Sequence, residues 1–163
     1  QELPQQGDSP WVLVRSWSDR HPVVEQAFHR GSGRWLRLGG AHPHIDPRAM
    51  GGTEFLRLKA RDGLEIPAYL TLPPGGGKNL PLLVWVHGGP WVRGGDWRWD
   101  PELQFLATRG YAVLRPEFRG STGFGAALFQ AGLRQWGRAM QDDLTDAARW
   151  AMAQGIADPK RIC

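Results

Sequence analysis

The first fifty residues alternate short apolar runs with turn-forming residues. Apolar runs at 11–14, 23–28 and 35–38 have strand length, and Gly, Pro, Ser and Asp separate them. Three such strands in succession predict an antiparallel unit, such as a meander or one blade of a propeller. One such unit cannot bury both of its faces, so we expect neighbouring strands to precede it. The stretch 39–52, rich in Gly and Pro, is interpreted as a linker.

The pattern changes after the linker. Two apolar stretches, 55–58 and 66–72, flank the turn Arg61-Asp62-Gly63 and predict a hairpin. Leu82–Val86 is apolar without interruption, which is typical of a central strand that is covered on both faces.

The rest of the chain alternates helix and strand. A helix is predicted over 101–109, a strand over 111–114 and a long helix over 138–154, whose apolar residues form one stripe. Asp158-Pro159 is interpreted as a turn, and a further strand is expected to begin at Arg161. A hairpin followed by strand, helix, strand, helix and strand predicts an α/β sheet whose later strands run parallel.

Composition narrows the class of protein. The net charge is +4 and the basic residues are scattered among acids and aromatics, so no nucleic-acid partner is predicted. No apolar run approaches the roughly 20 residues of a membrane span. The single cysteine, Cys163, cannot form an intramolecular disulfide, and the sequence assigns no compartment.

His87-Gly88-Gly89-Pro90 directly follows the predicted central strand. Paired glycines there let a ligand approach the backbone closely and leave amide N–H groups free to donate. Such donors can form an oxyanion hole, which stabilises the charge that develops on a carbonyl oxygen. A Gly-Gly-Pro turn after a strand is also common without any function, so this motif alone leaves both interpretations open.

Several further motifs occur in a fixed order and together carry a family resemblance. From Leu82 to Cys163, the chain resembles the first half of the catalytic domain of the prolyl oligopeptidase family of serine peptidases, nearest its acylaminoacyl-peptidase and dipeptidyl-peptidase-like branches. The matching segments are H-G-G-P (87–90), F-L-A-T-R-G-Y-A-V-L (105–114), R-G-S-T-G-F-G (119–125), W-G (136–137), D-D-L (142–144) and D-P-K-R-I (158–162).

The resemblance implies the fold and the domain organisation. Residues 51–163 are expected to form the N-terminal half of an α/β-hydrolase sheet. Residues 1–50 are expected to form the end of a β-propeller-like domain, with its last antiparallel blade and the linker. The likeness is closest over 53–163 and looser over 11–38.

The resemblance also assigns oxyanion-hole candidates, His87, Gly88 and Gly89. Several branches of the family have a tyrosine at the first of these positions, whose hydroxyl donates to the oxyanion. Here the imidazole N–H could donate, or the amides of Gly88 and Gly89 could do so while the ring orders the loop. We favour the role of the backbone amides.

The motif that follows the 111–114 strand is interpreted as a loop that supports the site through Arg119, Gly120, Ser121 and Gly123. Arg119 is expected to hold the loop by hydrogen bonds to carbonyls or a carboxylate. Ser121 is a poor nucleophile, because a G-x-S-x-G elbow needs glycine two residues to either side.

Other reactive side chains are given structural roles. Asp142 and Asp143 are expected to open the long helix, where carboxylates favour the helix dipole. His42 and His44 lack a third ligand for a metal site. Cys163 lies in the expected last strand and not in an elbow.

None of the catalytic triad is present. The family's nucleophilic serine lies in a G-x-S-x-G-G turn after the strand that Arg161 begins, and its Asp and His follow later. The complete protein is expected to hydrolyse short peptides through an acyl-enzyme, without metal or organic cofactor, and homo-oligomerisation is compatible with this.

This chain alone is expected to be inactive and to aggregate, because half a sheet leaves an unpaired edge. The alternatives are a carboxylesterase or other acyl hydrolase of the same fold, and a non-catalytic interaction module. Esterases more often have H-G-G-G where this chain has Pro90.

Overall fold

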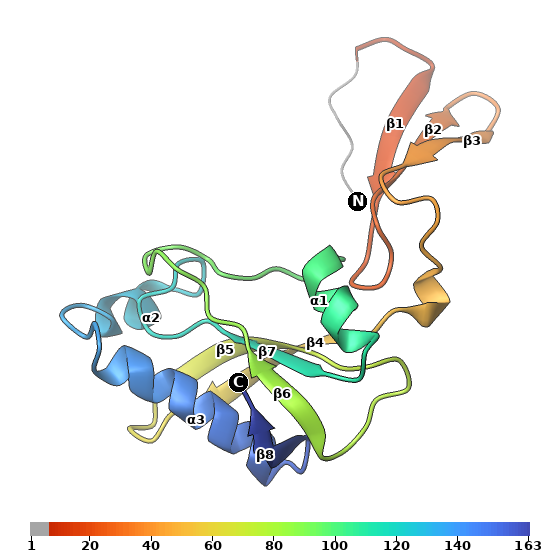
Figure 1. The fold of residues 1–163 in the computed structure, drawn as a ribbon. Helices are drawn as coiled ribbons and strands as arrows, with labels where there is room; N and C mark the ends of the chain where they lie inside the picture. Colours follow the sequence, from red (N-terminus) through yellow and green to blue (C-terminus); the bar gives the residue numbers. More distant parts are fainter. Residues whose placement is uncertain (1–6) are drawn as a thin grey trace.

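The computed structural model describes residues 7–163 and contains two sheets. The first consists of β1 (Trp11–Ser16), β2 (Val24–His29) and β3 (Trp35–Gly40), paired antiparallel in that order. This confirms the predicted antiparallel unit. Figure 1 shows that it projects from the rest of the molecule.

The second sheet has five strands: β4 (Thr53–Lys59), β5 (Glu65–Thr71), β6 (Leu80–Val84), β7 (Ala112–Pro116) and β8 (Ala157–Ile162). Their order across the sheet is β4-β5-β7-β6-β8. β4 and β5 form the predicted hairpin, and β5 pairs antiparallel with β7. β6 runs parallel to both β7 and β8, which confirms that the later strands are parallel.

The helices connect the strands of this second sheet. α1 (Pro101–Ala107) links β6 to β7, and α3 (Ala139–Ala153) precedes β8. These crossovers run in opposite directions across the sheet, so right-handed connections place α1 and α3 on opposite faces (Figure 1). α2 (Ala126–Ala131) lies between β7 and α3, and a 3-10 turn, Pro47–Ala49, lies in the predicted linker. None of the helices in residues 7–163 is both long and apolar enough to cross a membrane.

The core lies between the five-stranded sheet and α3. Its apolar side chains come from every strand of that sheet and from α2 and α3, and they pack into one cluster. Burying each large side chain of this kind stabilises the fold by about 1.5–3 kcal/mol. The fully buried members include Ile66, Leu70, Leu82 and Leu114.

α1 begins at Pro101, as predicted, and ends at Ala107, before the predicted Arg109. Asp100 is the N-cap, and its carboxylate accepts hydrogen bonds from the amides of Glu102 and Leu103. Pro101 fits the first helical position because no hydrogen bond is lost there. The chain turns after the helix at Gly110, where φ is +89°.

Two predicted strand bounds are wrong, and one helix was not predicted. β8 begins at Ala157 and not at Arg161. Asp158-Pro159 lies in an irregular part of this edge strand, because only Ala157 and Ile162 are in register with β6 and the Lys160 amide donates to the Asp158 side chain. The apolar run 82–86 was expected to be one strand covered on both faces, but β6 ends at Val84. Only Leu82 is fully buried in β6, because α1 packs mainly on β5 and β7. α2 was not predicted.

Candidate functional site

Two loops meet at the carboxyl ends of β6 and β7. Residues 87–95, here called the His87 loop, follow β6, and residues 117–125, here called the Arg119 loop, follow β7. Parallel neighbours end at the same edge of a sheet, so the two loops lie side by side. The amide of Thr122 donates to the carbonyl of Val92 at 3.1 Å. All predicted site residues lie in these two loops.

The His87 ring is turned into the protein. Its Nδ1 lies 2.9 Å from the carbonyl oxygen of Gly88, and its Nε2 lies 3.0 Å from Ser121 Oγ. The ring stacks on Phe118 with centroids 4.4 Å apart, and its side chain is only 11% exposed. The ring is therefore placed to order the loop, whereas the backbone of Gly88 and Gly89 is exposed.

The hydrogen bonds around His87 allow two proton arrangements. Nδ1 faces a carbonyl oxygen, so it carries a proton. Ser121 Oγ has one proton and two neighbours, His87 Nε2 and the carbonyl of Phe118 at 2.8 Å. If the hydroxyl donates to the ring, the imidazole is neutral. If it donates to Phe118, the ring donates to Ser121 and is an imidazolium facing Glu117, whose Oε2 lies 3.6 Å from Nε2.

Ser121, His87 and Glu117 have the side chains of a catalytic triad but not its geometry. In a triad, the carboxylate binds the ring nitrogen opposite the one that faces the serine. Here Ser121 and Glu117 both face Nε2, and Nδ1 faces the carbonyl of Gly88. Ser121 is also completely buried. This arrangement does not activate Ser121 as a nucleophile.

Glu117 is a part of this site that the sequence did not reveal. It is completely buried, and its two oxygens accept hydrogen bonds from the amides of Gly94 and Gly95. The one feature of the sequence that could have indicated Glu117 is its position as a single acidic residue directly after a buried strand. Its partners are backbone amides 22 and 23 residues away, which no motif indicates.

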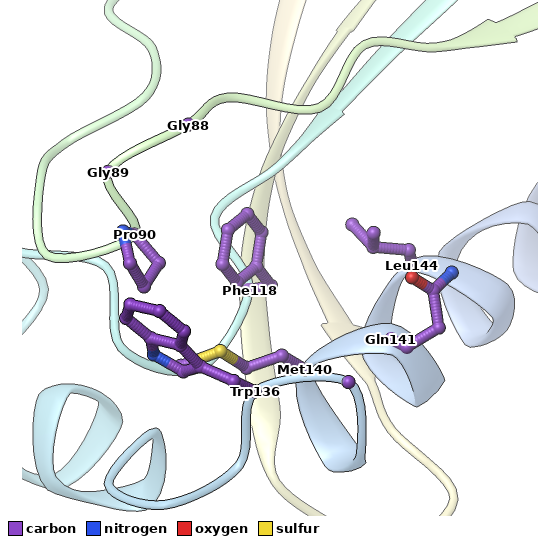
Figure 2. Close-up of a pocket in the computed structure, with 9 residues that line it drawn as sticks. Gly88, Gly89, Pro90, Phe118, Trp136, Met140, Gln141 and Leu144 are labelled. Carbon is purple, nitrogen blue, oxygen red and sulfur yellow. The ribbon is translucent and has the colours of Figure 1, made fainter.

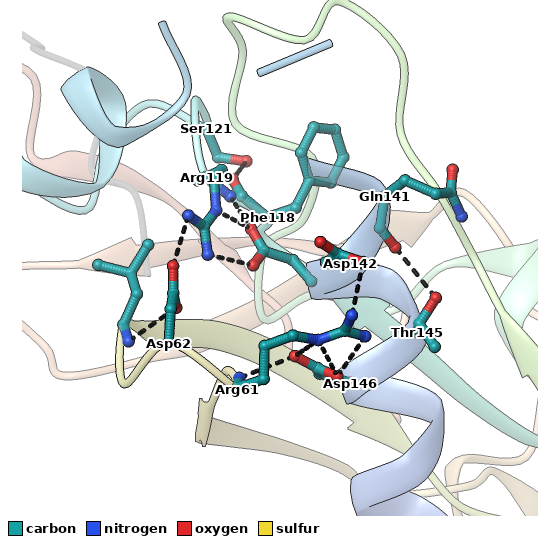
Figure 3. Close-up of polar contacts among 11 residues, drawn as sticks. Arg61, Asp62, Phe118, Arg119, Ser121, Gln141, Asp142, Thr145 and Asp146 are labelled. Carbon is teal, nitrogen blue, oxygen red and sulfur yellow. Dashed lines mark hydrogen bonds and ion pairs between the residues drawn. The ribbon is translucent and has the colours of Figure 1, made fainter. Parts of the chain in front are cut away.

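Arg119 binds two carboxylates (Figure 3). Its Nε and Nη2 donate to Asp143 at 2.9 and 2.8 Å, and its Nη1 donates to Asp62 at 2.8 Å. The bonds with Asp143 raise the pKa of Arg119 above its ordinary value, and the bond from Arg119 lowers the pKa of Asp62. Arg119 therefore fixes the start of its loop to α3 and to the β4–β5 turn.

The two aspartates near the start of α3 differ from each other. The helix begins at Ala139, and Asp142 lies in its first turn, as expected for the dipole. Asp142 also pairs with Arg61, at 2.7 Å. Asp143 is buried, and its main contact is Arg119. From the sequence we expected a role at the helix dipole and did not predict this contact.

Two glycines of the Arg119 loop have backbone conformations that favour glycine. Gly120 has φ of +102°, and its amide donates to the carbonyl of Leu128 in α2. A Cβ on Gly120 would lie 2.9 Å from the Met140 side chain. Gly123 has φ of +87° and packs against the Arg93 side chain.

An open, mostly apolar hollow of about 330 Å³ lies beside the His87 loop (Figure 2). Figure 2 shows Gly88, Gly89 and Pro90 along one side of it and Phe118 and α3 side chains along the others. Within residues 7–163, neither the Gly88 nor the Gly89 amide donates to another protein atom. The hollow thus has mostly apolar walls, and the two glycines along one side of it have amides without a hydrogen-bond acceptor among the described residues.

The other candidates lie apart from this site. The rings of His42 and His44 are 6.0 Å apart, and His42 packs on Trp99. Across residues 7–163, no three His, Cys, Asp or Glu side chains are grouped to hold a metal ion. Cys163 is exposed after β8.

Known proteins have similar sequences. Residues 97–163 match the model of the prolyl oligopeptidase family, Peptidase_S9. Dipeptidyl aminopeptidase BIII of Pseudoxanthomonas mexicana is 35% identical over an alignment of 163 residues. This alignment covers 95% of this chain and 23% of that protein. Dipeptidyl peptidase family member 6 of Caenorhabditis elegans is 31% identical over 176 residues, covering 94% and 24%. The chain spans about a quarter of the length of these curated relatives.

Solved structures share the fold. A puromycin-hydrolyzing peptidase of Mycobacterium tuberculosis matches with a TM-score of 0.77 and 28% identity, over 96% of this chain and 25% of that one. A structure from a study of two prolyl endopeptidases matches with a TM-score of 0.76 over 99% of this chain and 24% of that one. Its 20% identity supports the fold alone. These matches confirm the predicted fold class.

Proposed function

Because the chain belongs to the prolyl oligopeptidase family, we propose that the complete protein that carries it is a serine-type peptidase acting on short peptides. The complete protein means this segment joined to the remainder of the hydrolase domain. The observation that supports the proposal is the pair of unpaired amides, Gly88 and Gly89, at the carboxyl end of β6 beside an apolar hollow.

In this proposal, the His87 loop forms part of the oxyanion hole. Attack of a serine on the substrate carbonyl places negative charge on its oxygen, and the amide of Gly88 or Gly89 donates to that oxygen. Such preorganised donors act where the charge develops, and removing one costs about 10²–10³-fold in kcat. The inward-facing His87 ring holds the loop and does not itself donate to the oxyanion. The serine is supplied by a part of the protein outside this sequence.

We further propose that the substrates are peptides with a free N-terminus, from which a dipeptide is released. This follows the names of two similar proteins, a dipeptidyl aminopeptidase and a dipeptidyl peptidase family member. The peptide is the partner of the complete protein, and the reaction uses a covalent acyl-enzyme.

A substrate panel tests the reaction. The complete protein should release fluorophore from dipeptidyl amides, and much more slowly from aminoacyl amides and from N-acetylated dipeptidyl amides. Hydrolysis of p-nitrophenyl esters without any amide hydrolysis would favour an esterase. No turnover, together with a missing G-x-S-x-G-G elbow in the complete sequence, would favour the interaction module.

Variants of the loop test the oxyanion role. Gly88→Pro removes an amide proton, so kcat should fall by about 10²-fold with little change in KM. His87→Ala removes the contacts to Ser121 and Phe118, so kcat should fall less, by about tenfold. If both variants keep the wild-type kcat, the loop is not part of the oxyanion hole.

A further inference from the structure

Glu117 is a completely buried carboxylate that no step of the proposed reaction uses. It directly follows β7, and its Oε2 accepts from the Gly94 amide at 2.9 Å while its Oε1 accepts from the Gly95 amide. Both amides lie at the far end of the His87 loop. At the near end of the same loop, His87 Nε2 lies 3.6 Å from Glu117 Oε2. One side chain therefore contacts both ends of the loop.

The loop reaches this carboxylate because residues 94 and 95 have no side chains. A Cβ on Gly94 would overlap the His87 ring, and a Cβ on Gly95 would lie 3.0 Å from the Tyr69 ring and 3.2 Å from Glu117. The chain thus folds back tightly around Glu117. The His87 ring lies inside this turn, and Gly88 and Gly89, which follow it, are exposed.

We propose that Glu117 is a positioning residue, which holds the His87 loop so that the amides of Gly88 and Gly89 face the hollow. A buried carboxylate is costly unless it is hydrogen-bonded, and within residues 7–163 the hydrogen bonds that the Glu117 carboxylate accepts come from the His87 loop. The inference rests on the proposed oxyanion role of the loop. It adds that the conformation of the loop depends on the protein beneath it and not on the substrate.

Glu117→Gln tests the inference with minimal change in shape. A carboxylate offers an acceptor to each amide, whereas a glutamine offers one acceptor and turns an NH₂ group toward the other amide. The loop should shift, and a shift near 1 Å can cost about 10²-fold in rate. We expect kcat to fall about 10- to 100-fold with KM nearly unchanged, because the donors act mainly in the transition state.

Two measurements separate this effect from misfolding. Titration of the active serine with a fluorophosphonate gives the fraction of folded enzyme, by which kcat is corrected. Asp146→Asn is the matched control, because it also replaces a largely buried, ion-paired carboxylate but lies on α3 away from the loop. It should keep the wild-type kcat.

A second variant covers the case in which Glu117→Gln does not fold. Gly94→Ala leaves the carboxylate in place and displaces the His87 ring, so it should show the same fall in kcat at constant KM. Hydrogen exchange adds a readout that needs no activity. The amides of Gly94 and Gly95 should exchange slowly in the wild type and at least about tenfold faster in Glu117→Gln.

The outcomes separate the inference from the proposed function. If the folded variant, or both variants, retain the wild-type kcat, Glu117 does not position the loop. If the wild type hydrolyses no amide, the proposed function is wrong, and the exchange rates of Gly94 and Gly95 alone then decide whether Glu117 holds the loop. Unchanged exchange rates would overturn the inference in that case.

Discussion

The side-chain amide of Gln104 donates to the main-chain oxygen of Asp19 at 3.1 Å and so joins α1 of the second sheet to the β1–β2 turn of the first. The same amide donates to the carbonyl of Gly51 and accepts from its N–H, both at 2.8 Å. Asp19 in turn accepts from the amide of Thr53 at the start of β4. These buried bonds fix the chain as it passes from one sheet to the other.

Gln104→Ala should loosen this junction. It leaves the Gly51 N–H and carbonyl without their partner, and each buried group left unpaired costs about 1–3 kcal/mol. In the complete protein, hydrogen exchange of a peptide containing Gly51 should become faster. Glu102→Ala, on the exposed side of the same helix, should change the free energy of unfolding by less than about 0.5 kcal/mol. Equal exchange in both variants would contradict the role given to Gln104.

Asp143→Asn should destabilise the protein more than Asp142→Asn. Asp143 is completely buried and binds Arg119 with both oxygens, whereas Asp142 is nearly half exposed and pairs with Arg61. Removing one partner of a buried pair costs about 3–5 kcal/mol, and Asp62 remains to offset part of this for Arg119. Urea unfolding should give a loss of about 3 kcal/mol for Asp143→Asn and below about 1 kcal/mol for Asp142→Asn.

The elements that the sequence predicted well have a strong hydrophobic period. α3 was expected over 138–154 and covers Ala139–Ala153, because its apolar stripe and Gly155 define both ends. α2 has six residues and a single buried one, Leu128, so it has no period to detect. Asp158-Pro159 has the composition of a turn, and it lies where the pairing of β8 with β6 is interrupted between Ala157 and Ile162.

The sequence predicted the two loops of the candidate site but not the contacts that join them. The H-G-G-P and R-G-S-T-G-F-G motifs locate the loops through local composition. The contact of His87 with Ser121 and that of Arg119 with Asp143 join residues 34 and 24 positions apart, and Glu117 binds main-chain amides. Such contacts depend on the order of strands in the sheet, and no local pattern determines them.

The ion pair of Asp146 should make stability depend on pH. Hydrogen bonding from Arg61 lowers the pKa of Asp146 in the folded protein. The unfolded chain then binds more protons, so this contribution to the free energy of unfolding is present above the unfolded pKa, near about 4, and is lost as the pH falls through the folded pKa. Asp146→Asn should therefore be less stable than the wild type at pH 6, and the difference should shrink toward pH 3.

Urea unfolding between pH 3 and pH 7 measures this difference. Glu102→Gln, which removes one negative charge from an exposed position, is the control for the change in net charge. A difference between wild type and Asp146→Asn that stays constant over this range would show that the Arg61 pair does not contribute through its charge.

Gly120→Ala and Gly125→Ala separate backbone strain from packing in the Arg119 loop. Both glycines have positive φ, +102° and +99°, so alanine is strained at either position by about 1–3 kcal/mol. A Cβ at Gly125 meets nothing within 4 Å, whereas at Gly120 it meets Met140 at 2.9 Å and Trp91 at 3.1 Å. Gly120→Ala should therefore lose more stability by urea unfolding. It should also lower kcat, because residue 120 lies between Arg119 and Ser121 and any shift there reaches the His87 ring. Equal losses in the two variants would mean that the side chains around Gly120 move aside without strain.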